Sequence, residues 1–575
     1  MKFDKETIIV LAICFIVLMA WQPICEHMGW IKAPATETVK NKIEKSKETV
    51  SSAVPSPDTD KDAKEAAPSP LKPENISSAS GVKQLPEYVL SNNCIEITIN
   101  PNMGSVSSVR LKKFFKADRK DNIVLDKNID RGALEISWTP SGWTLTNIKT
   151  DAISKDEYHL TRTFTKGDES FQLIQEWKLP LDDYIAKYRI TVRNTGAKTL
   201  SLNDILVNAG GIAPLHSMTG DIVRSETHCI EWCNTATDKL TRIDAAAKEQ
   251  AFNASATEQP LSWISISNKY FASILLADET FTKGNSVFRK MLPPINGTPS
   301  DLYTISSSGR FNNLSLPPGS SENFNLKYFT GPKELALLKK LSPSTPLIMH
   351  LSFWYPLEMI SQWLLVALVY LKNIFGSYGI SIIILTIIVR AAFWPVTQRA
   401  NKSMQKMQKI QPMVQEIRTK YKDNPQILNS KIMGLYKEQK VNPLGGCLPI
   451  LLQLPVFFAL YSTLDGAVEL RQTSFLWCHD LSMPDTIASI FGLGIHPLII
   501  AMTLLMVVQQ KITPASPDPM QQKMMMFMPL IMLVFLYNLP SGLTLYWTVS
   551  QIISIIQLYI NKRAAQNEQE KAAAL

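Results

Sequence analysis

A single arginine lies in the middle of an apolar run that is long enough to cross a bilayer. The run covers residues 377–398, and at the rise of an α-helix Arg390 lies about 16 Å from Gly379 and about 13 Å from Arg399. A cation at that depth costs about 2.5–3.5 kcal/mol on insertion scales. Thr386 lies one turn earlier on the same face. This spacing indicates a water-accessible polar site inside the membrane. The alternative is an arginine that snorkels to the surface, for which its side chain is short.

Other reactive side chains form no recognisable catalytic or metal-binding pattern. The seven cysteines are scattered, and Cys229 and Cys233 would close a small loop only in a domain outside the cytoplasm. No histidine pair accompanies them, and surface or core roles are expected for the isolated His159, His216 and His228. Carboxylates on the predicted strands are not paired as glycoside hydrolysis requires, and the sequence contains no nucleotide-binding motif. We therefore expect no enzyme, cofactor or metal.

The chain opens with an apolar segment over residues 7–21, which follows Lys2 and Lys5. It is either a cleaved signal peptide or a membrane anchor, and the lack of a small-residue cleavage site favours an uncleaved anchor within residues 1–32. Residues 33–87 contain no aromatic side chain and are rich in Lys, Glu, Ser, Ala and Pro. That composition cannot bury a core, so this segment is predicted to be a disordered tether.

From about Tyr88 onward the apolar residues alternate with polar ones. In residues 184–192, for example, Tyr184, Tyr188 and Val192 share one face while Lys187 and Arg189 share the other. Many short runs of this kind, separated by Gly, Asn and Pro, predict an antiparallel β-sandwich over residues 88–332. We expect this domain to be a scaffold or a docking surface.

The remainder of the chain is dominated by apolar segments. The apolar residues 355–375 include Glu358, Gln362 and Lys372. The whole segment 333–376 is therefore predicted to form amphipathic helices that lie in the membrane interface rather than a span. Residues 377–563 are predicted to form a core of five spans. With the anchor, the six predicted spans are residues 7–21, 377–398, 444–464, 486–510, 524–538 and 543–560.

Basic residues in the connecting segments set the orientation. Residues 398–443 contain ten Lys or Arg against three Asp or Glu, whereas residues 465–484 contain only Arg471 against three acidic residues. The first segment is therefore predicted to be cytoplasmic and the second external. Counting spans from there places both termini in the cytoplasm, with the tail at 564–575, and the β-domain in the periplasm of a bacterium. The predicted fold is a polytopic α-helical membrane protein with a large periplasmic antiparallel β-sandwich.

The cytoplasmic segment 399–442 has helical propensity in two parts. Residues 402–421 and 426–439 flank a break at Asp423-Asn-Pro425, which predicts a helical hairpin. Its positive charge is of the kind that keeps a loop in the cytoplasm. Its methionines indicate an adaptable apolar surface as well; they are Met404, Met407, Met413 and Met433.

Four ordered motifs make the chain similar to a known family. They are Arg390 within Ile-Ile-Val-Arg, Asn442–Pro449, Asp518–Lys523 and Leu539–Leu543. Together they resemble the YidC/Oxa1/Alb3 membrane protein insertases, and the N-terminal anchor and β-domain resemble the Gram-negative form. The resemblance covers nearly the whole chain. It implies a supersandwich-like β-domain, a location in the bacterial inner membrane, and a role in inserting and helping to fold inner-membrane proteins.

The resemblance also implies a hydrophilic groove that is open to the cytoplasm and to lipid. Its lining maps onto Arg390, Thr386, Tyr546, Trp547, Gln453 and Gln510. Trp547 stands where some relatives have tyrosine. The implied partners are nascent membrane proteins, the phospholipid bilayer, the Sec translocon (SecYEG with SecDF), and the ribosome and signal recognition pathway through the cytoplasmic loops, with no specific nucleic acid. The tail after Arg563 is barely basic, which argues against strong ribosome binding by the tail itself.

Two other classes fit the sequence less well. An ion-coupled transporter usually needs a carboxylate near mid-membrane and often has inverted repeats, and the predicted spans have neither. A membrane-tethered carbohydrate enzyme would retain its activity in the isolated β-domain, so truncation distinguishes it from an insertase.

The charge pattern generates a topology prediction. In spheroplasts treated with protease from outside, residues 398–443 and the C-terminus should be protected, while residues 88–330 should be digested. Disruption of the membrane with detergent is the control and should expose both regions. Cleavage within residues 398–443 of intact spheroplasts would overturn the predicted orientation.

Overall fold

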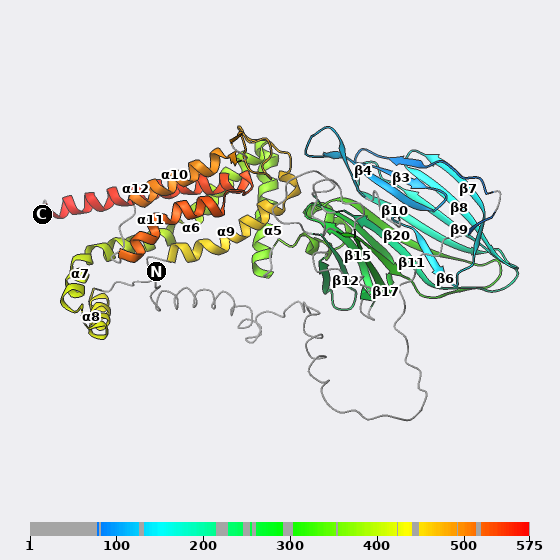
Figure 1. The fold of residues 1–575 in the computed structure, drawn as a ribbon, viewed down its shortest axis with the longest axis horizontal. Coiled ribbons are helices and arrows are strands. Elements are labelled where there is room, and N and C mark those ends of the chain that lie inside the picture. Colours follow the sequence, from blue (N-terminus) through cyan, green and yellow to red (C-terminus); the bar gives the residue numbers. More distant parts are fainter. Residues whose placement is uncertain are drawn as a thin grey trace, which may run out of the picture. The chain divides into compact units, whose positions relative to one another are not determined.

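The computed structural model describes residues 77–79, 82–125, 132–213, 215, 228–244, 254–255, 260–290, 303–351, 355–422, 424–439, 448–490, 493–512 and 519–573. The chain divides into two units, Met1–Ile348 and Met349–Leu575, the first built from strands and the second from helices (Figure 1). The predicted anchor and most of the predicted tether, together with His216, lie outside the described residues.

Three sheets build the described part of the first unit. The largest has ten strands in the order β1 (Ser77–Ser78), β7 (Thr144–Ser154), β8 (Glu157–Lys166), β9 (Glu169–Lys178), β10 (Ile185–Asn194), β20 (Ser321–Pro332), β16 (Phe271–Phe281), β15 (Leu261–Asn268), β12 (His228–Asn234) and β13 (Leu240–Asp244). A second has the order β14 (Ala254–Ser255), β17 (Lys283–Lys290), β18 (Tyr303–Arg310), β11 (Leu200–Ile212) and β19 (Leu314–Leu316), with β6 (Ile136–Thr139) also paired to β11. The third is β2 (Tyr88–Ser91), β3 (Ile95–Asn100), β4 (Ser105–Phe115) and β5 (Asn122–Leu125).

The alternation seen in the sequence matches the two faces of these strands. On β10, Tyr188 and Val192 are buried, whereas Lys187 and Arg189 are exposed. The described pairings are antiparallel except for β1 with β7. The prediction of a β-rich domain made largely of antiparallel strands is therefore confirmed.

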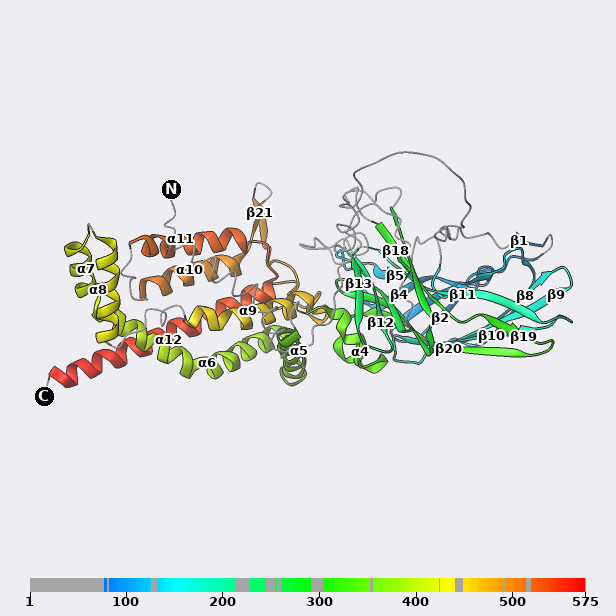
Figure 2. The ribbon, with the colours of Figure 1, turned by 90° about the horizontal axis from the view of Figure 1, so that it is seen from below.

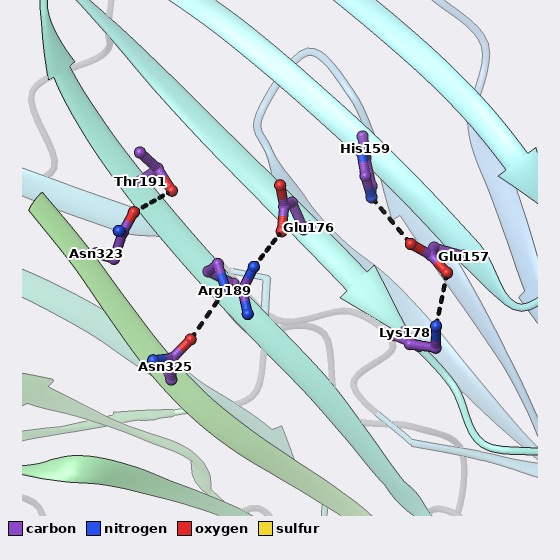
Figure 3. Close-up of polar contacts among 8 residues, drawn as sticks. All are labelled: Glu157, His159, Glu176, Lys178, Arg189, Thr191, Asn323 and Asn325. Atoms are coloured by element: carbon purple, nitrogen blue, oxygen red, sulfur yellow. Dashed lines mark hydrogen bonds and ion pairs between the residues drawn. The ribbon is translucent and has the colours of Figure 1, made fainter. Parts of the chain in front are cut away.

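The exposed face of the large sheet is covered by polar side chains that bind one another across strands (Figure 3). Arg189 donates to Glu176 on β9 at 3.3 Å and to Asn325 on β20 at 3.0 Å. Glu157 on β8 lies 2.9 Å from Lys178 and 3.3 Å from His159. Exposed pairs of this kind contribute little each, but they follow the strand register and disfavour a slip.

Cys229 and Cys233 do not form the small loop that their spacing allowed. Both lie on β12 and both are free and buried. Four residues of extended strand separate them by roughly 13 Å, far beyond the reach of a disulfide. Burial raises the pKa of the Cys229 thiol to about 12, so the reactive thiolate is disfavoured.

A short helical segment closes the first unit. Helix α4 (Leu335–Leu341) buries Leu335, Leu338 and Leu341, and the 3-10 turn η1 (Thr345–Met349) follows it. Lys340 on α4 lies 2.5 Å from Asp183 of the β-sandwich. This part of the predicted interfacial segment therefore packs on the β-domain.

The second unit contains eight described helices and one small hairpin. The helices are α5 (Tyr355–Phe375), α6 (Tyr378–Lys409), α7 (Gln411–Lys420), α8 (Pro425–Glu438), α9 (Leu448–Gly466), α10 (Pro497–Ile512), α11 (Pro519–Phe535) and α12 (Ser541–Ala573), and the connection from α9 to α10 holds a 3-10 turn, η3 (Val468–Leu470), and strands β21 (Ala488–Ile490) and β22 (Leu493–Ile495). Figures 1 and 2 show α6, α9, α10, α11 and α12 running along a common direction, with α5 crossing it.

The predicted segments and the observed helices differ in several places. Within the described residues, three helices are long and apolar enough to cross a membrane, over Pro356–Phe375, Tyr378–Pro395 and Ser541–Ala564, and α10 and α11 have shorter apolar stretches. The count of six spans is therefore not confirmed. The segment 486–510 begins as the β21–β22 hairpin and becomes helical only at Pro497. An interfacial position of α5 stays a prediction.

The buried His228 generates a prediction on stability. Its Nε2 donates to the carbonyl of Ile212 at 2.6 Å, and burial lowers the pKa of His228 to about 4 from its ordinary value of 6.5. The unfolded chain binds the proton first, so stability falls as pH drops from about 6.5 toward 4. The expected loss at pH 5 is about 2 kcal/mol relative to pH 7.

Thermal unfolding of the full chain, followed by the fluorescence of buried tryptophans in the β-domain, measures this loss. In His228→Gln the drop between pH 7 and pH 5 should shrink. The matched control is His159→Gln, which removes a half-exposed histidine on β8 and should leave the drop unchanged. An identical pH dependence in all three proteins would contradict the assignment to His228.

Candidate functional site

Arg390 lies at the contact between α6 and α12. Its Nε donates to Ser550 Oγ at 2.6 Å, which joins the apolar stretch of α6 to that of α12. One turn earlier, Thr386 is fully buried, and its hydroxyl donates to the carbonyl of Ile382 in its own helix at 2.6 Å. Further along the two helices, Gln557 Nε2 donates to the carbonyl of Trp394 at 3.5 Å. The two helices therefore run parallel, with polar contacts at two levels.

Tyr546 and Ser550 belong to the same face of α12, because they are four residues apart. Tyr546 is buried, with only 3% of its surface exposed. Its neighbour Trp547 points to another helix and packs edge-to-face on Phe457 of α9, with ring centroids 4.9 Å apart. The two aromatic residues that the resemblance paired thus serve two interfaces, one beside Arg390 and one against α9.

Two further predicted lining residues belong to other helices. Gln510 lies near the end of α10 and is half-buried. Gln453 lies on α9, and its side chain is outside the described ones. Of the six predicted residues, the structure brings Arg390, Thr386 and Tyr546 to the α6–α12 region.

Short hydroxyl side chains join the other helices. Ser361 on α5 donates to the carbonyl of Ala459 on α9 at 3.2 Å, and Thr463 on α9 donates back to the carbonyl of Ser361 at 3.1 Å. Thr548 on α12 reaches the carbonyl of Leu498 on α10 at 3.4 Å. Such hydroxyls let helices approach closely and satisfy polar atoms where water is excluded.

The residues 467–496, which we call the loop cap, hold the start of α10. Asp485 is buried, and its carboxylate accepts from the backbone N–H of Leu498 at 2.7 Å and from Trp477 Nε1 at 3.1 Å. A carboxylate at that place satisfies an N–H of the first helical turn and complements the helix dipole. Burial also raises the pKa of Asp480 in the same cap, with Ser482 opposing the shift by hydrogen bonding.

The loop cap also covers the start of α12 and of α6. The backbone N–H of Gly542 donates to the carbonyl of Leu481 at 2.9 Å. At Gly379, near the start of α6, an added Cβ would come within 2.0 Å of the Phe475 ring. The ring therefore occupies the space that any larger residue would need, and the loop end of the bundle is tightly packed.

Ser550, Asp485 and the Ser361–Thr463 pair were not singled out from the sequence. Ser550 follows Tyr546 by one turn, so its position on the same helical face was available as a signal. Asp485 precedes Pro497 by twelve residues, and no local pattern connects an acid at that distance to a helix start. Across the described part of the chain, no three His, Cys, Asp or Glu side chains gather as a metal site would require.

Comparisons with known proteins cover both units. The family model for the YidC periplasmic domain matches residues 87–366, and the model for the 60Kd inner membrane protein matches residues 370–569. The membrane protein insertase YidC of Pelobacter propionicus is 34% identical over 479 residues, which is 80% of this chain and 83% of the relative. That of Geobacter metallireducens is 40% identical over 337 residues, 58% of each chain.

One of the solved structures that match this chain is also a YidC insertase. The crystal structure of an active YidC insertase with its first transmembrane domain resolved is 19% identical, covering 84% of this chain and 94% of that one, with a TM-score of 0.35. The matched regions and the close relatives define an inner-membrane protein insertase with a periplasmic β-domain, and not an enzyme. The chain belongs to the YidC family.

The Arg390–Ser550 bond generates a prediction on the stability of the helical unit. A hydrogen bond to a charged group contributes about 1.5–3 kcal/mol, so Ser550→Ala should lower the unfolding free energy by about that amount. Ser554→Ala is the matched control, because the Ser554 hydroxyl donates to the carbonyl of Ser550 within α12. Its loss should lower the unfolding free energy by less than about 0.5 kcal/mol. Unfolding in mixed micelles measures both variants. Equal losses would show that Ser550 does not anchor the arginine.

Proposed function

We propose that this chain inserts membrane proteins through a hydrophilic groove that contains Arg390. The observation that carries the proposal is the position of Arg390 within the apolar stretch of α6, where it donates to Ser550 of α12. A bilayer-embedded guanidinium is costly, and a structure retains it where it faces polar groups, water or a substrate. A short hydrophilic segment of a nascent chain would enter beside it and avoid the full cost of dehydration.

The loop cap fits a groove that is closed at one end. In the proposed orientation this end faces the periplasm, where Asp485 holds α10 and Phe475 fills the space above Gly379. The other end is the cytoplasmic one, and substrates would enter there and leave sideways into lipid. Thr386 and Tyr546 flank Arg390, and we assign Trp547, Gln453 and Gln510 to more distant parts of the lining.

No covalent chemistry is needed for this cycle. Moving an apolar helix from the groove into lipid releases about 0.8 kcal/mol for each buried CH₂ group, which is enough to drive insertion of a hydrophobic segment. Translocation of an acidic tail also gains from a positive charge in a partly shielded site and depends on the membrane potential. The proposal therefore places the driving force in the substrate.

The remaining assignments of topology and partners belong to the same proposal. Six spans would include the N-terminal anchor, α6 and α9 to α12, with α5 lying in the outer interface and crossing the direction of the bundle (Figure 1). Both termini and the α7–α8 hairpin would lie in the cytoplasm, where the hairpin and the adjoining loops would meet the ribosome and the signal recognition pathway. The insertase would act alone or beside the Sec translocon, including SecDF.

Two roles of Arg390 lead to different mutant behaviour. If the residue provides a positive charge, Arg390→Lys should retain much of the insertion activity and Arg390→Ala should lose more. The loss should be largest for substrates whose translocated tails carry Asp or Glu. If Arg390 instead braces α6 against α12 through its guanidinium, the lysine variant should fail nearly as badly as the alanine variant, with a loss of stability.

An insertion assay with reconstituted variants separates these outcomes. Matched substrates should differ only in acidic or neutral residues of the translocated tail. We expect at least a tenfold larger loss for acidic tails in Arg390→Ala, which corresponds to about 1.4 kcal/mol of pairing energy. Ser550→Ala is the companion variant, since it removes the bond and keeps the charge. Equal loss for both tail types in Arg390→Ala would refute the electrostatic role.

A further inference from the structure

The hairpin between β4 and β5 concentrates positive charge on the surface of the β-domain. Residues 110–121, which we call the basic hairpin, contain six Lys or Arg and two Asp, a net charge of +4. Asp121 lies 3.9 Å from Lys116, and Asp118 accepts from the backbone N–H of Lys120 at 3.0 Å. Glu96 on the adjacent β3 lies 3.8 Å from Arg110 and 3.4 Å from Lys112, so these residues together keep an excess of three positive charges. Its tip, residues 117–121, is exposed throughout. A protrusion of this charge is suited to an anionic partner.

An aromatic side chain lies among these charges. The pairing of β4 with β5 shifts register between Leu111 and Phe115, and beyond this shift Phe114 is half-buried and packs edge-to-face on Phe271 with ring centroids 5.5 Å apart. Phe115 and Lys113 are exposed, with 37% of the Phe115 surface accessible. A large exposed aromatic ring between lysines is costly in water, but it suits the boundary between headgroups and acyl chains.

The basic hairpin lies at the end of the β-domain where the chain departs for the helical unit. Phe271, its packing partner, is paired with Pro332 at the end of β20. Burial raises the pKa of Glu334, which precedes α4, and the nearby charge of Lys113 opposes that shift. Figure 2 shows β4, β5 and α4 at the same end of the β-domain. Tyr355, the first residue of α5, follows Glu334 by only 21 residues.

We propose that the basic hairpin docks the β-domain onto anionic phospholipid headgroups of the membrane in which the helical unit is embedded. Both of its features fit this partner, because lysines attract the headgroups and Phe115 enters the layer beneath them. An acidic polypeptide would use the charges alone. Since the chain is anchored in the same bilayer, the effective concentration of lipid is high, and a weak contact suffices. Each cation near such a surface changes the ratio of docked to undocked hairpins about fivefold.

The test uses the full chain reconstituted in nanodiscs, with a fluorophore attached at Ala117→Cys on the exposed tip. Lipids with a quencher on the headgroup report proximity, and the parent chain treated with the same dye gives the background. In discs containing phosphatidylglycerol, the ratio of docked to undocked hairpins should exceed that in phosphatidylcholine discs at least about tenfold. In about 1 M salt, where the Debye length falls to about 3 Å, the difference should disappear.

Matched variants assign the effect to the hairpin. Lys113→Gln, Lys116→Gln and Lys120→Gln together should return the ratio to its value in phosphatidylcholine, and Phe115→Ala alone should lower it partly. The control triple is Lys166→Gln, Arg193→Gln and Lys198→Gln, which removes three charges at the end of β8 and near the end of β10. This variant should retain docking.

Three results would overturn the proposal. The first is quenching that does not depend on phosphatidylglycerol or salt. The second is an equal loss in the control triple. The third is a soluble polyglutamate peptide that changes the fluorophore in neutral discs as strongly as anionic lipid does, since this would assign the basic hairpin to an acidic polypeptide.

Discussion

The helical unit depends on providing polar partners for one guanidinium inside an apolar bundle. Arg390 is held by Ser550, and the other helices are joined by hydroxyls that bind backbone carbonyls, as Ser361 does at Ala459. Because hydrocarbon offers no water to satisfy polar atoms, each of these side chains must find its partner within the protein. In the function we propose, the same condition makes the site receptive to hydrophilic chain segments, which also need polar partners. Packing and the proposed function would then rest on one requirement.

The β-domain differs from the helical unit, because one face of its large sheet is exposed to water. Arg189 joins Glu176 and Asn325 across three strands, so the polar side chains of that face satisfy one another and leave little to recruit a partner. On the basic hairpin, Arg110 and Lys112 share one acid, Glu96, at 3.8 Å and 3.4 Å, and the segment keeps an excess of positive charge. The contrast explains why we assign contact with the membrane surface to β4 and β5 rather than to the broad face of the sheet.

Much of this architecture could be predicted where a local pattern determines it. The alternation around Tyr188 predicted buried and exposed faces correctly, and the break at Pro425 predicted the start of α8, where Asn424 caps the helix. Helix α6 was expected to end near residue 398 but continues to Lys409, because Pro395 lies inside it without ending it. Contacts between distant segments, such as Asp485 with the start of α10, have no local signature. They arise only when the loop folds back on the bundle.

Helix α12 runs without interruption for 33 residues, a length of about 50 Å. A hydrocarbon layer about 30 Å thick cannot contain all of it, so its final turns project as a rigid rod from the bundle. Ser550 lies about 34 Å from the end of this rod, so a tilt of about 10° at that residue would displace the tip by roughly 6 Å. The length of the helix therefore means that even a small rearrangement around the guanidinium would be magnified at the tip, in the aqueous phase.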